Sequence, residues 1–246
     1  MSVFVTGGSR GIGRSIVEAA LTAGHDVAFT YRSNAAAAEA VVAWARTQAP
    51  DRRCEAFALD VADPAAVEAV GDAVLDALGE IDTVICNAGV VANELAVHMS
   101  DTRWAEVLGT NLSGAFYVSR FFLPSLLASG GGSLVFVGSI AADGMAGQAA
   151  YAASKAGLVG LAKSLAKEYG RKGITANVVV PGFIDSDMTR ESMPAPLKAF
   201  WAEFCPMRRM GQASEVADAV LFLASSAARF VNGQTLGVTG GLEWAP

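Results

Sequence analysis

The amino-acid sequence predicts an α/β protein, a doubly wound sheet of about seven parallel strands with helices on both faces. Short apolar, β-branched runs alternate with alanine-rich stretches of helix length along almost all of the 246 residues. The runs lack polar–apolar alternation, which indicates strands that are covered on both faces. Regular strand–helix alternation implies right-handed crossovers and therefore a parallel sheet.

Seven apolar runs are the candidate strands: Val3–Thr6, Asp26–Tyr31, Cys54–Leu59, Thr83–Cys86, Ser133–Gly138, Ile174–Val180 and Gln234–Val238. The stretches between them have the length of helices, and three of these helices show recognisable ends. Gly24 follows the first helix and is expected just past its last residue. Asp63-Pro64 is typical of an N-cap followed by a first-turn proline. Ser214 is expected to cap the last helix.

Composition excludes several classes of function. The chain has 18 Lys and Arg against 24 Asp and Glu, a net charge of −6. A nucleic-acid-binding protein would need a basic surface, so no nucleic-acid partner is expected. Three widely spaced cysteines and two histidines predict neither a disulfide framework nor a metal site, and they favour a reducing, cytoplasmic location.

No membrane span or targeting segment is expected. The longest stretch without charged residues, Phe121 to Ala142, contains Pro124 and the run Gly130–Gly132. These residues are expected to break a helix well short of the ~20 residues that a span requires. Met1 and Ser2 lead directly into the first strand, without a basic region or an apolar segment of signal-peptide length.

Residues 183–210 interrupt the alternation within what is otherwise one domain over residues 1–246. The segment carries several methionines and aromatic residues with prolines between them. Ligands of open α/β sheets bind beyond the carboxyl ends of the strands, so an apolar insertion at this place favours a substrate lid. A plain helical excursion that packs on the core is the alternative.

A glycine-rich loop follows the first strand and opens the first helix. Glycines at 7, 11 and 13 allow a tight turn and a close approach to a pyrophosphate. The free N–H groups at the start of the helix would then face the anion. The residues expected at this dinucleotide site are Gly7, Ser9, Arg10, Gly11, Ile12 and Gly13.

The end of the second strand indicates which dinucleotide is bound. A site for NAD usually offers a carboxylate there, but the sequence has Tyr31-Arg32-Ser33. Arg32 and Arg10 suit a 2′-phosphate, because guanidinium groups form charge-assisted and bidentate bonds with phosphate. The sequence therefore predicts NADP(H), with a solvated surface role for Arg32 as the alternative.

The ends of the third and fourth strands provide further cofactor candidates. Asp60-Val61 follows the third strand, where the carboxylate of Asp60 can accept a bond from an adenine amino group or cap the local backbone. Asn87-Ala88-Gly89 follows the fourth strand, where small residues allow close passage of a cofactor or form a simple turn.

Tyr151, Lys155 and Ser139 are the candidate chemical residues. Tyr151 and Lys155 are four residues apart and share one helix face. An ammonium group near a phenol lowers a pKa that starts near ~10, so that the phenol can exchange a proton with a carbonyl or alcohol oxygen. Ser139 ends the preceding strand and can hydrogen-bond the same oxygen. Carbonyl–alcohol interconversion needs this arrangement.

Asn111 lies within a predicted helix, where its residue type has no favourable propensity. A buried amide at this position could disturb the helix and hold a water that links Lys155 to solvent. A surface asparagine is the alternative.

These residues resemble the short-chain dehydrogenase/reductase family over essentially the whole chain. The matching motifs are Thr6-Gly7-(x)3-Gly11-Ile12-Gly13, Asn87-Ala88-Gly89, Asn111, Ser139, Tyr151-(x)3-Lys155 and Pro181-Gly182. The resemblance implies a Rossmann-type fold with strand order 3-2-1-4-5-6-7. It also implies a catalytic tetrad of Asn111, Ser139, Tyr151 and Lys155, with Lys155 also holding the nicotinamide ribose.

The same resemblance implies further contacts and an assembly. Pro181, Gly182 and Ile184 would border the nicotinamide, Thr189 would lie near its carboxamide, and Gly182 and Phe183 would line the substrate site. Family members are commonly homotetramers. The helices around Asn111 and after Tyr151 would form one interface, and the C-terminal strand another.

Within the family, the motifs are most similar to the 3-oxoacyl-[acyl-carrier-protein] reductases, which implies NADPH-dependent reduction of a 3-oxoacyl thioester. Arg171, Lys172 and Arg120 are candidates for meeting an acidic carrier protein. Leu126–Ser133 lacks the basic residues that such reductases usually carry. Acyl-CoA, a dedicated carrier, a free ketone or a secondary alcohol such as a sugar therefore remain alternative substrates, and a non-catalytic NADP(H)-binding protein is a remote alternative.

Overall fold

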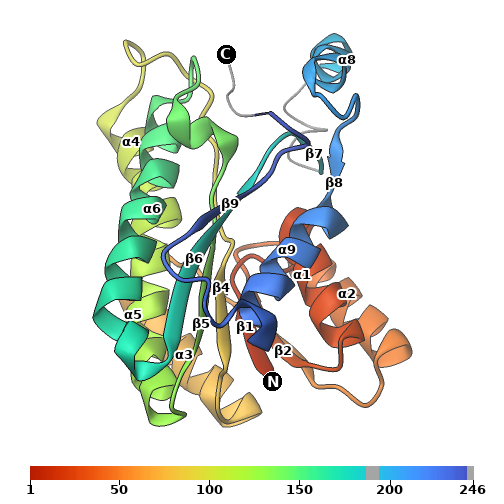
Figure 1. The fold of residues 1–246 in the computed structure, drawn as a ribbon, viewed down its shortest axis with the longest axis vertical. Helices are drawn as coiled ribbons and strands as arrows, with labels where there is room; N and C mark the ends of the chain where they lie inside the picture. Colours follow the sequence, from red (N-terminus) through yellow and green to blue (C-terminus); the bar gives the residue numbers. More distant parts are fainter. Residues whose placement is uncertain (187–193, 243–246) are drawn as a thin grey trace.

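The computed structural model describes residues 1–186 and 194–242. Seven parallel strands form its main sheet in the order β3-β2-β1-β4-β5-β6-β9 (Figure 1). Their bounds are β1 Ser2–Val5, β2 Asp26–Tyr31, β3 Cys54–Ala58, β4 Thr83–Cys86, β5 Gly132–Val137, β6 Ile174–Pro181 and β9 Thr235–Val238. The predicted class, the seven strands and the strand order are confirmed, and no strand end differs from the prediction by more than one residue.

Helices cover both faces of the sheet (Figure 1). One face carries α3 (Pro64–Leu78), α5 (Gly114–Ala128) and α6 (Ala149–Tyr169), and the other carries α1 (Gly11–Thr22), α2 (Ala35–Gln48) and α9 (Ala213–Ala224). In β1, Phe4 packs into the first core, whereas Val3 and Val5 pack into the second. Because both faces of the central strands are buried, their sequences are mostly apolar, whereas the edge strands β3 and β9 are partly exposed.

Three helix ends test the expected caps. Gly24 adopts φ +84° just past the C-cap Ala23, and the Asp63 side chain accepts the N–H groups of Ala65 and Ala66, as predicted. The prediction for Ser214 is wrong. Helix α9 is capped from Gln212, in a reciprocal arrangement in which the Glu215 carboxylate accepts the Gln212 N–H at 2.7 Å.

The stretch from Phe121 to Ala142 is broken short of a membrane span as predicted, but at the glycine run and not at Pro124. Pro124 lies inside α5, which continues to Ala128 before the glycine run. The neighbouring Phe122 and Leu126 are buried, and their burial offsets the hydrogen bond that the proline lacks. Among the described residues, no helix combines the length and the apolar character needed to cross a membrane.

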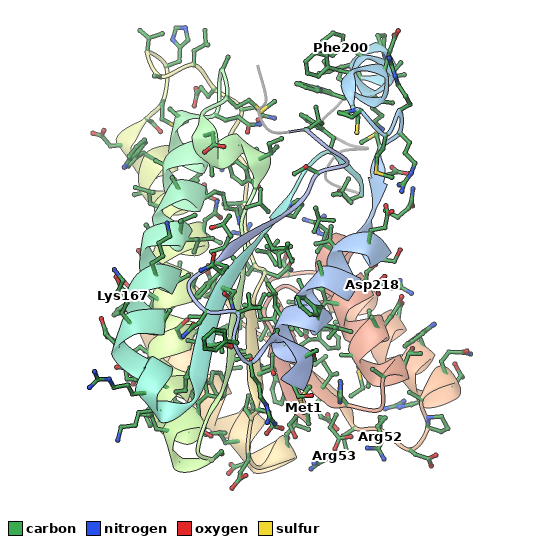
Figure 2. All side chains as sticks on the ribbon, in the orientation of Figure 1. Met1, Arg52, Arg53, Lys167, Phe200 and Asp218 are labelled. Atoms are coloured by element: carbon green, nitrogen blue, oxygen red, sulfur yellow. The ribbon has the colours of Figure 1, made fainter. Side chains whose placement is uncertain are left out.

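The described parts of the segment between β6 and α9 lie beyond one end of the sheet (Figure 1). They contain the short strands β7 (Ile184–Asp185) and β8 (Gly211–Gln212), which pair with each other, and α8 (Ala195–Phe204). Phe200 on α8 is half-exposed at the end of the molecule that α8 occupies (Figure 2). Helix α8 lies apart from the layers that cover the main sheet (Figure 1).

Candidate active site

The glycine loop has the geometry that a pyrophosphate requires. Gly7 and Gly11 adopt φ +68° and +55°, backbone conformations that favour glycine. A Cβ on Gly13 would lie 2.1 Å from the Gly7 carbonyl oxygen, so helix α1 can pack this closely on the loop only with glycine there. A Cβ on Gly11 would meet only Ser186, at 3.9 Å, which leaves this part of the loop open to a ligand.

Helix α1 begins at this open position. Its N-cap residue, Arg10, gives the first turn no side-chain hydrogen bond. The N–H groups at the start of a helix can bind anions, and those that no side chain caps are available for this role. A polar cavity of about 340 Å³ adjoins Gly11 and is also bordered by Asp185, Ser186 and Ser214. The residues present therefore fit a dinucleotide pyrophosphate.

Asn87 ties the glycine loop to the end of β4. Its amide nitrogen donates to the carbonyl oxygens of Thr6 and Gly7, each at 3.0 Å. The Thr6 hydroxyl accepts the N–H groups of Asn87 and Ala88, each at 3.0 Å. The Gly7 N–H donates to the Thr30 hydroxyl oxygen at 3.3 Å, which joins the end of β2 to the same loop. Sequence reasoning assigned Asn87 to a cofactor passage but missed this bonding role and those of Thr6 and Thr30.

The predicted adenosine end lies beyond β2 and β3. Four of its candidate residues are exposed: Arg10, Arg32, Ser33 and Asp60. Tyr31 is half-buried and Val61 is buried. One carboxylate oxygen of Asp60 accepts the Ala62 N–H at 3.0 Å, so the backbone-capping alternative for Asp60 is realised at that oxygen. The Arg32 guanidinium lies 3.9 Å from Glu106, a carboxylate that the sequence analysis did not consider.

Ser139, Tyr151 and Lys155 come together at the carboxyl ends of β5 and β6. Ser139 follows β5 and accepts the Ala141 N–H at 3.2 Å, and its side chain is near enough to the Tyr151 phenol to act on that group's pKa. The Lys155 ammonium is buried, donates to the Val137 carbonyl oxygen at 2.7 Å, and lies 5.7 Å from the centre of the Tyr151 ring. The predicted cluster is therefore present in the fold.

Burial controls the proton affinities of this cluster. It raises the pKa of the Tyr151 phenol above 10, and the hydrogen bond with Ser139 only partly opposes that rise. It lowers the pKa of Lys155 to about 8. The expectation that Lys155 lowers the tyrosine pKa is therefore not met. Desolvation is the larger cause, the Ser139 hydroxyl is the opposing one, and the net shift of the tyrosine pKa is upward.

Asn111 lies in a π-helical turn, Gly109–Ser113, between α4 (Asp101–Leu108) and α5. Its side chain is buried, which rules out the surface alternative. The side-chain oxygen accepts the Val90 N–H at 2.8 Å, and the side-chain nitrogen donates to Ser154 Oγ at 3.0 Å. Asn111 thus joins the loop after β4 to the helix that carries Tyr151, and the helix is disturbed at this amide as predicted.

Gly89 lies between Asn111 and Lys155. A Cβ on Gly89 would lie 3.3 Å from the Asn111 side-chain oxygen and 3.5 Å from the Lys155 nitrogen. The end of β4, the π-helical turn and α6 therefore meet at one place, and the absence of a side chain at Gly89 keeps space there.

Aromatic packing forms the other side of the site. Phe183, just beyond Pro181 and Gly182, stacks on Trp201 of α8 with the ring centres 3.9 Å apart. Trp201 belongs to a buried cluster with Cys205, Leu242 and Ile140, the residue next to Ser139. Sequence reasoning included Trp201 in a lid segment but gave it no role. Thr189 lies outside the described residues, and Ile184 begins β7.

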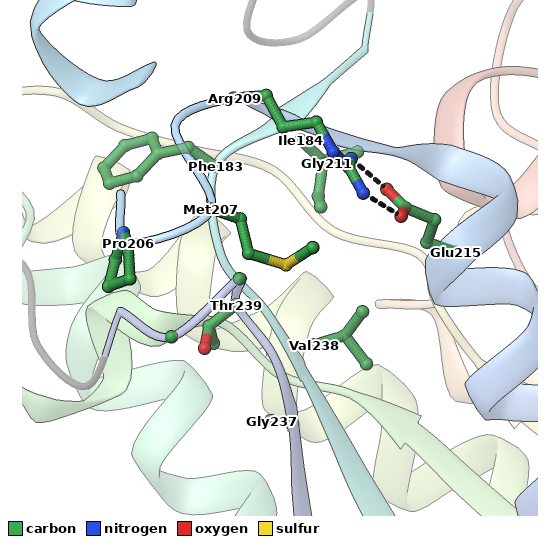
Figure 3. A pocket seen from close by; sticks show the side chains of 12 residues that line it. Phe183, Ile184, Pro206, Met207, Arg209, Gly211, Glu215, Gly237, Val238 and Thr239 are labelled. Carbon is green, nitrogen blue, oxygen red and sulfur yellow. Dashed lines mark hydrogen bonds and ion pairs between the residues drawn. The ribbon is translucent and has the colours of Figure 1, made fainter. Parts of the chain in front are cut away.

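A cavity of about 540 Å³ opens beside Phe183 (Figure 3). Ile184, Met207 and Val238 provide apolar walls, and the double ion pair between Arg209 and Glu215, at 2.5 and 2.8 Å, lies at one side. The ion pair and the Gln212 N–H lower the pKa of Glu215 to about 2. None of the four tetrad residues lines this cavity.

A glycine loop suited to a pyrophosphate and a tyrosine, lysine and serine cluster lie on a Rossmann-type sheet. This combination defines the class of dinucleotide-dependent oxidoreductases. The sequence profile of a family described as "Enoyl-(Acyl carrier protein) reductase" matches residues 7–243. The chain belongs to the short-chain dehydrogenase/reductase family.

Individual relatives agree with this assignment. The 3-oxoacyl-[acyl-carrier-protein] reductase FabG of Escherichia coli (strain K12) is 39% identical over 239 residues, 97% of this chain and 95% of that protein. The enzyme of the same name from Staphylococcus aureus (strain N315) is 39% identical over 244 residues, 98% of this chain and 97% of that protein. The crystal structure of levodione reductase matches with a TM-score of 0.94 and 32% identity, covering 98% of this chain and 96% of that chain.

Proposed function

We propose that the protein reduces a 3-oxoacyl thioester to the 3-hydroxyacyl thioester with NADPH. The single observation that carries this proposal is the convergence of Ser139, Tyr151 and Lys155 beside a loop that fits a dinucleotide. The substrate class follows from the full-length similarity to 3-oxoacyl-[acyl-carrier-protein] reductases.

The chain's residues act on one carbonyl oxygen. Bound NADPH would supply the hydride to the carbonyl carbon. Tyr151, which the buried site keeps protonated, donates its proton to the oxygen, while Ser139 holds that oxygen by a hydrogen bond. Positioned donors of this kind stabilise the negative charge that develops on a carbonyl oxygen.

Lys155 and Asn111 support the phenol. When Lys155 is protonated, its ammonium favours the phenolate that forms as Tyr151 releases its proton. In the family pattern, Lys155 also holds the nicotinamide ribose. Asn111 fixes the π-helical turn and Ser154 beside these groups, and we propose that the turn holds the water through which Tyr151 is reprotonated.

The remaining cofactor contacts are proposed from the residues that follow successive strands of the sheet. We propose that Gly7 to Gly13 bind the pyrophosphate, and that Arg10 and Arg32 select the 2′-phosphate. Tyr31, Ser33, Asp60 and Val61 would surround the adenosine. Asn87 to Gly89, Pro181, Gly182 and Ile184 would line the nicotinamide half, and residues 183–210 would cover the substrate as a lid. Phe183 and Gly182 would contact the acyl group.

Carrier docking depends on the assembly. Arg171 and Lys172 follow the far end of α6, about 30 Å from Tyr151 by helical rise. These two residues therefore cannot flank the entrance of their own subunit, which corrects the expectation for them. Exposed aromatic residues lie near both proposed interfaces. Trp104 on α4 and Phe116 on α5 lie near the first, and Phe222 on α9 and Phe230, before β9, lie near the second. A cytoplasmic homotetramer is the proposed assembly, in which a neighbour could bring basic residues to each entrance.

A second candidate function is reduction of a different ketone. The likeness to levodione reductase favours it, because that structure matches with a TM-score of 0.94. Steady-state kinetics with NADPH would separate the two, using acetoacetyl-carrier protein, acetoacetyl-CoA and a panel of simple and cyclic ketones. Higher kcat/KM for the thioesters supports the proposal. Turnover of ketones alone would replace it with the second candidate.

A further inference from the structure

A carboxylate stands beside the arginine that the cofactor proposal uses. Arg32 Nη1 lies 3.9 Å from Glu106 Oε1, with 52% and 38% of the two side chains exposed. Arg32 directly follows β2 and Glu106 lies on α4, so the pair connects two segments that are far apart in the sequence. No pattern in the sequence indicated this contact.

Glu106 is held in this position by a second arginine. Its other oxygen, Oε2, accepts a bond from Arg103 Nη1 at 2.6 Å. Arg103 also donates from Nη2 to the Val91 carbonyl oxygen at 3.2 Å, in the loop between β4 and α4. The carboxylate is therefore fixed on one side by Arg103 and faces Arg32 with its remaining oxygen.

The end of α4 borders the region proposed for the adenosine. A Cβ on Gly109, one residue past α4, would lie 3.8 Å from the Ala62 Cβ in the loop after β3. Glu106 is three residues before Gly109 on the same helical segment. The carboxylate thus lies at the edge of the space bounded by the ends of β2 and β3, where a 2′-phosphate would meet Arg32.

We propose that Glu106 is a specificity-determining residue that competes with the 2′-phosphate of NADP(H) for Arg32. This inference rests on the proposed function. The phosphate carries nearly two negative charges at neutral pH, so a neighbouring carboxylate opposes its binding. The 2′-hydroxyl of NADH is neutral and meets no such opposition. Glu106 therefore limits the preference for NADPH over NADH that Arg10 and Arg32 create.

The size of the effect follows from the exposure of the pair. Exposed charge pairs contribute little, and the corresponding change in affinity is about 2–5-fold. Salt screens such interactions, so the effect is expected to shrink as ionic strength rises from ~0.01 M to ~0.5 M.

The test is equilibrium binding of NADPH and NADH to Glu106→Gln, measured by nucleotide fluorescence at low ionic strength. The Kd for NADPH is expected to fall about 2–5-fold, while the Kd for NADH changes less than about twofold. Glu168→Gln is the matched control, since it removes the same charge from an exposed position near the far end of α6. It should change neither Kd.

A double variant tests the route through Arg32. In an Arg32→Gln background, Glu106→Gln is expected to change NADPH affinity by less than about twofold. An undiminished effect in that background, or weaker NADPH binding by Glu106→Gln alone, would overturn the proposal. If the natural protein shows no preference for NADPH over NADH, the proposed cofactor choice itself fails. If the natural protein prefers NADPH over NADH and Glu106→Gln leaves both Kd values unchanged, only the proposed role of Glu106 is overturned.

Discussion

The two sides of the proposed active site, one for the cofactor and one for the substrate, are held together by different forces. The cofactor side is joined by short hydrogen bonds between side chains and backbone, such as those from Asn87 to Thr6 and from Lys155 to Val137. The substrate side is joined by aromatic packing, chiefly Phe183 on Trp201. Among the described residues, none accepts a hydrogen bond from the buried indole N–H of Trp201.

This difference matches what each side has to do. Hydrogen bonds are directional, so they fix the glycine loop and the lysine in one arrangement. Stacked rings gain most of their energy from contact area and tolerate small shifts. We therefore expect the proposed cofactor side to be the more rigid of the two, and the proposed substrate side to tolerate small rearrangements.

The largest loss of activity is expected from substitution of Tyr151, the proposed general acid, which lies between the two sides. Tyr151→Phe should lower kcat by about 10²–10⁴-fold, because it removes the general acid and little volume. Its Kd for NADPH should stay within about threefold of the natural protein, since the bonds of the cofactor side remain. Near-normal turnover by this variant would remove Tyr151 from its proposed role.

The pH dependence of the reduction comes next in size. Burial lowers the pKa of Lys155 to about 8, so its ammonium is lost as the pH rises through that value, whereas the pKa of Tyr151 lies above 10. The value of kcat/KM for reduction should therefore fall above about pH 8, approaching tenfold per unit. A profile that stays flat to pH 9.5 would contradict the role of Lys155.

Removing hydrogen bonds from the cofactor side should have a moderate effect on stability and on NADPH binding. Asn87→Ala removes two hydrogen bonds to backbone carbonyls, so it should lower the free energy of unfolding by about 1–3 kcal/mol and raise the Kd for NADPH about tenfold. Asn93→Ala is the control, because Asn93 makes an exposed bond with Gln148. Equal effects of the two variants in denaturant titration and nucleotide binding would argue against a rigid cofactor side.

The smallest effect is expected on the adaptable side. Trp201→Phe retains an aromatic ring opposite Phe183 and removes the buried indole N–H. The KM for a 3-oxoacyl thioester should change less than about threefold, and the Kd for NADPH should not change. A KM increase above tenfold in steady-state kinetics would show that the substrate side is as exacting as the cofactor side.

Local patterns in the sequence predicted the strands and placed Tyr151, Lys155 and Ser139, because apolar runs and helical spacing are local features. They did not reveal contacts between distant positions. Asn87 and Thr6 are 81 residues apart, and neither Glu106 nor Trp201 belongs to a motif. The proton affinity of Tyr151 also escaped prediction, since desolvation depends on packing. The local pattern at Ser214 gave a wrong N-cap for α9, because Gln212 and Glu215 provide the cap.

The central claim is that Tyr151 and Ser139 act on one carbonyl oxygen, and a crystal structure with NADP⁺ and a bound 3-oxoacyl thioester tests it most directly. The keto oxygen is expected within about 3 Å of both Tyr151 Oη and Ser139 Oγ, the range in which a general acid can transfer its proton. A substrate bound with that oxygen beyond the reach of both hydroxyl groups would contradict the account.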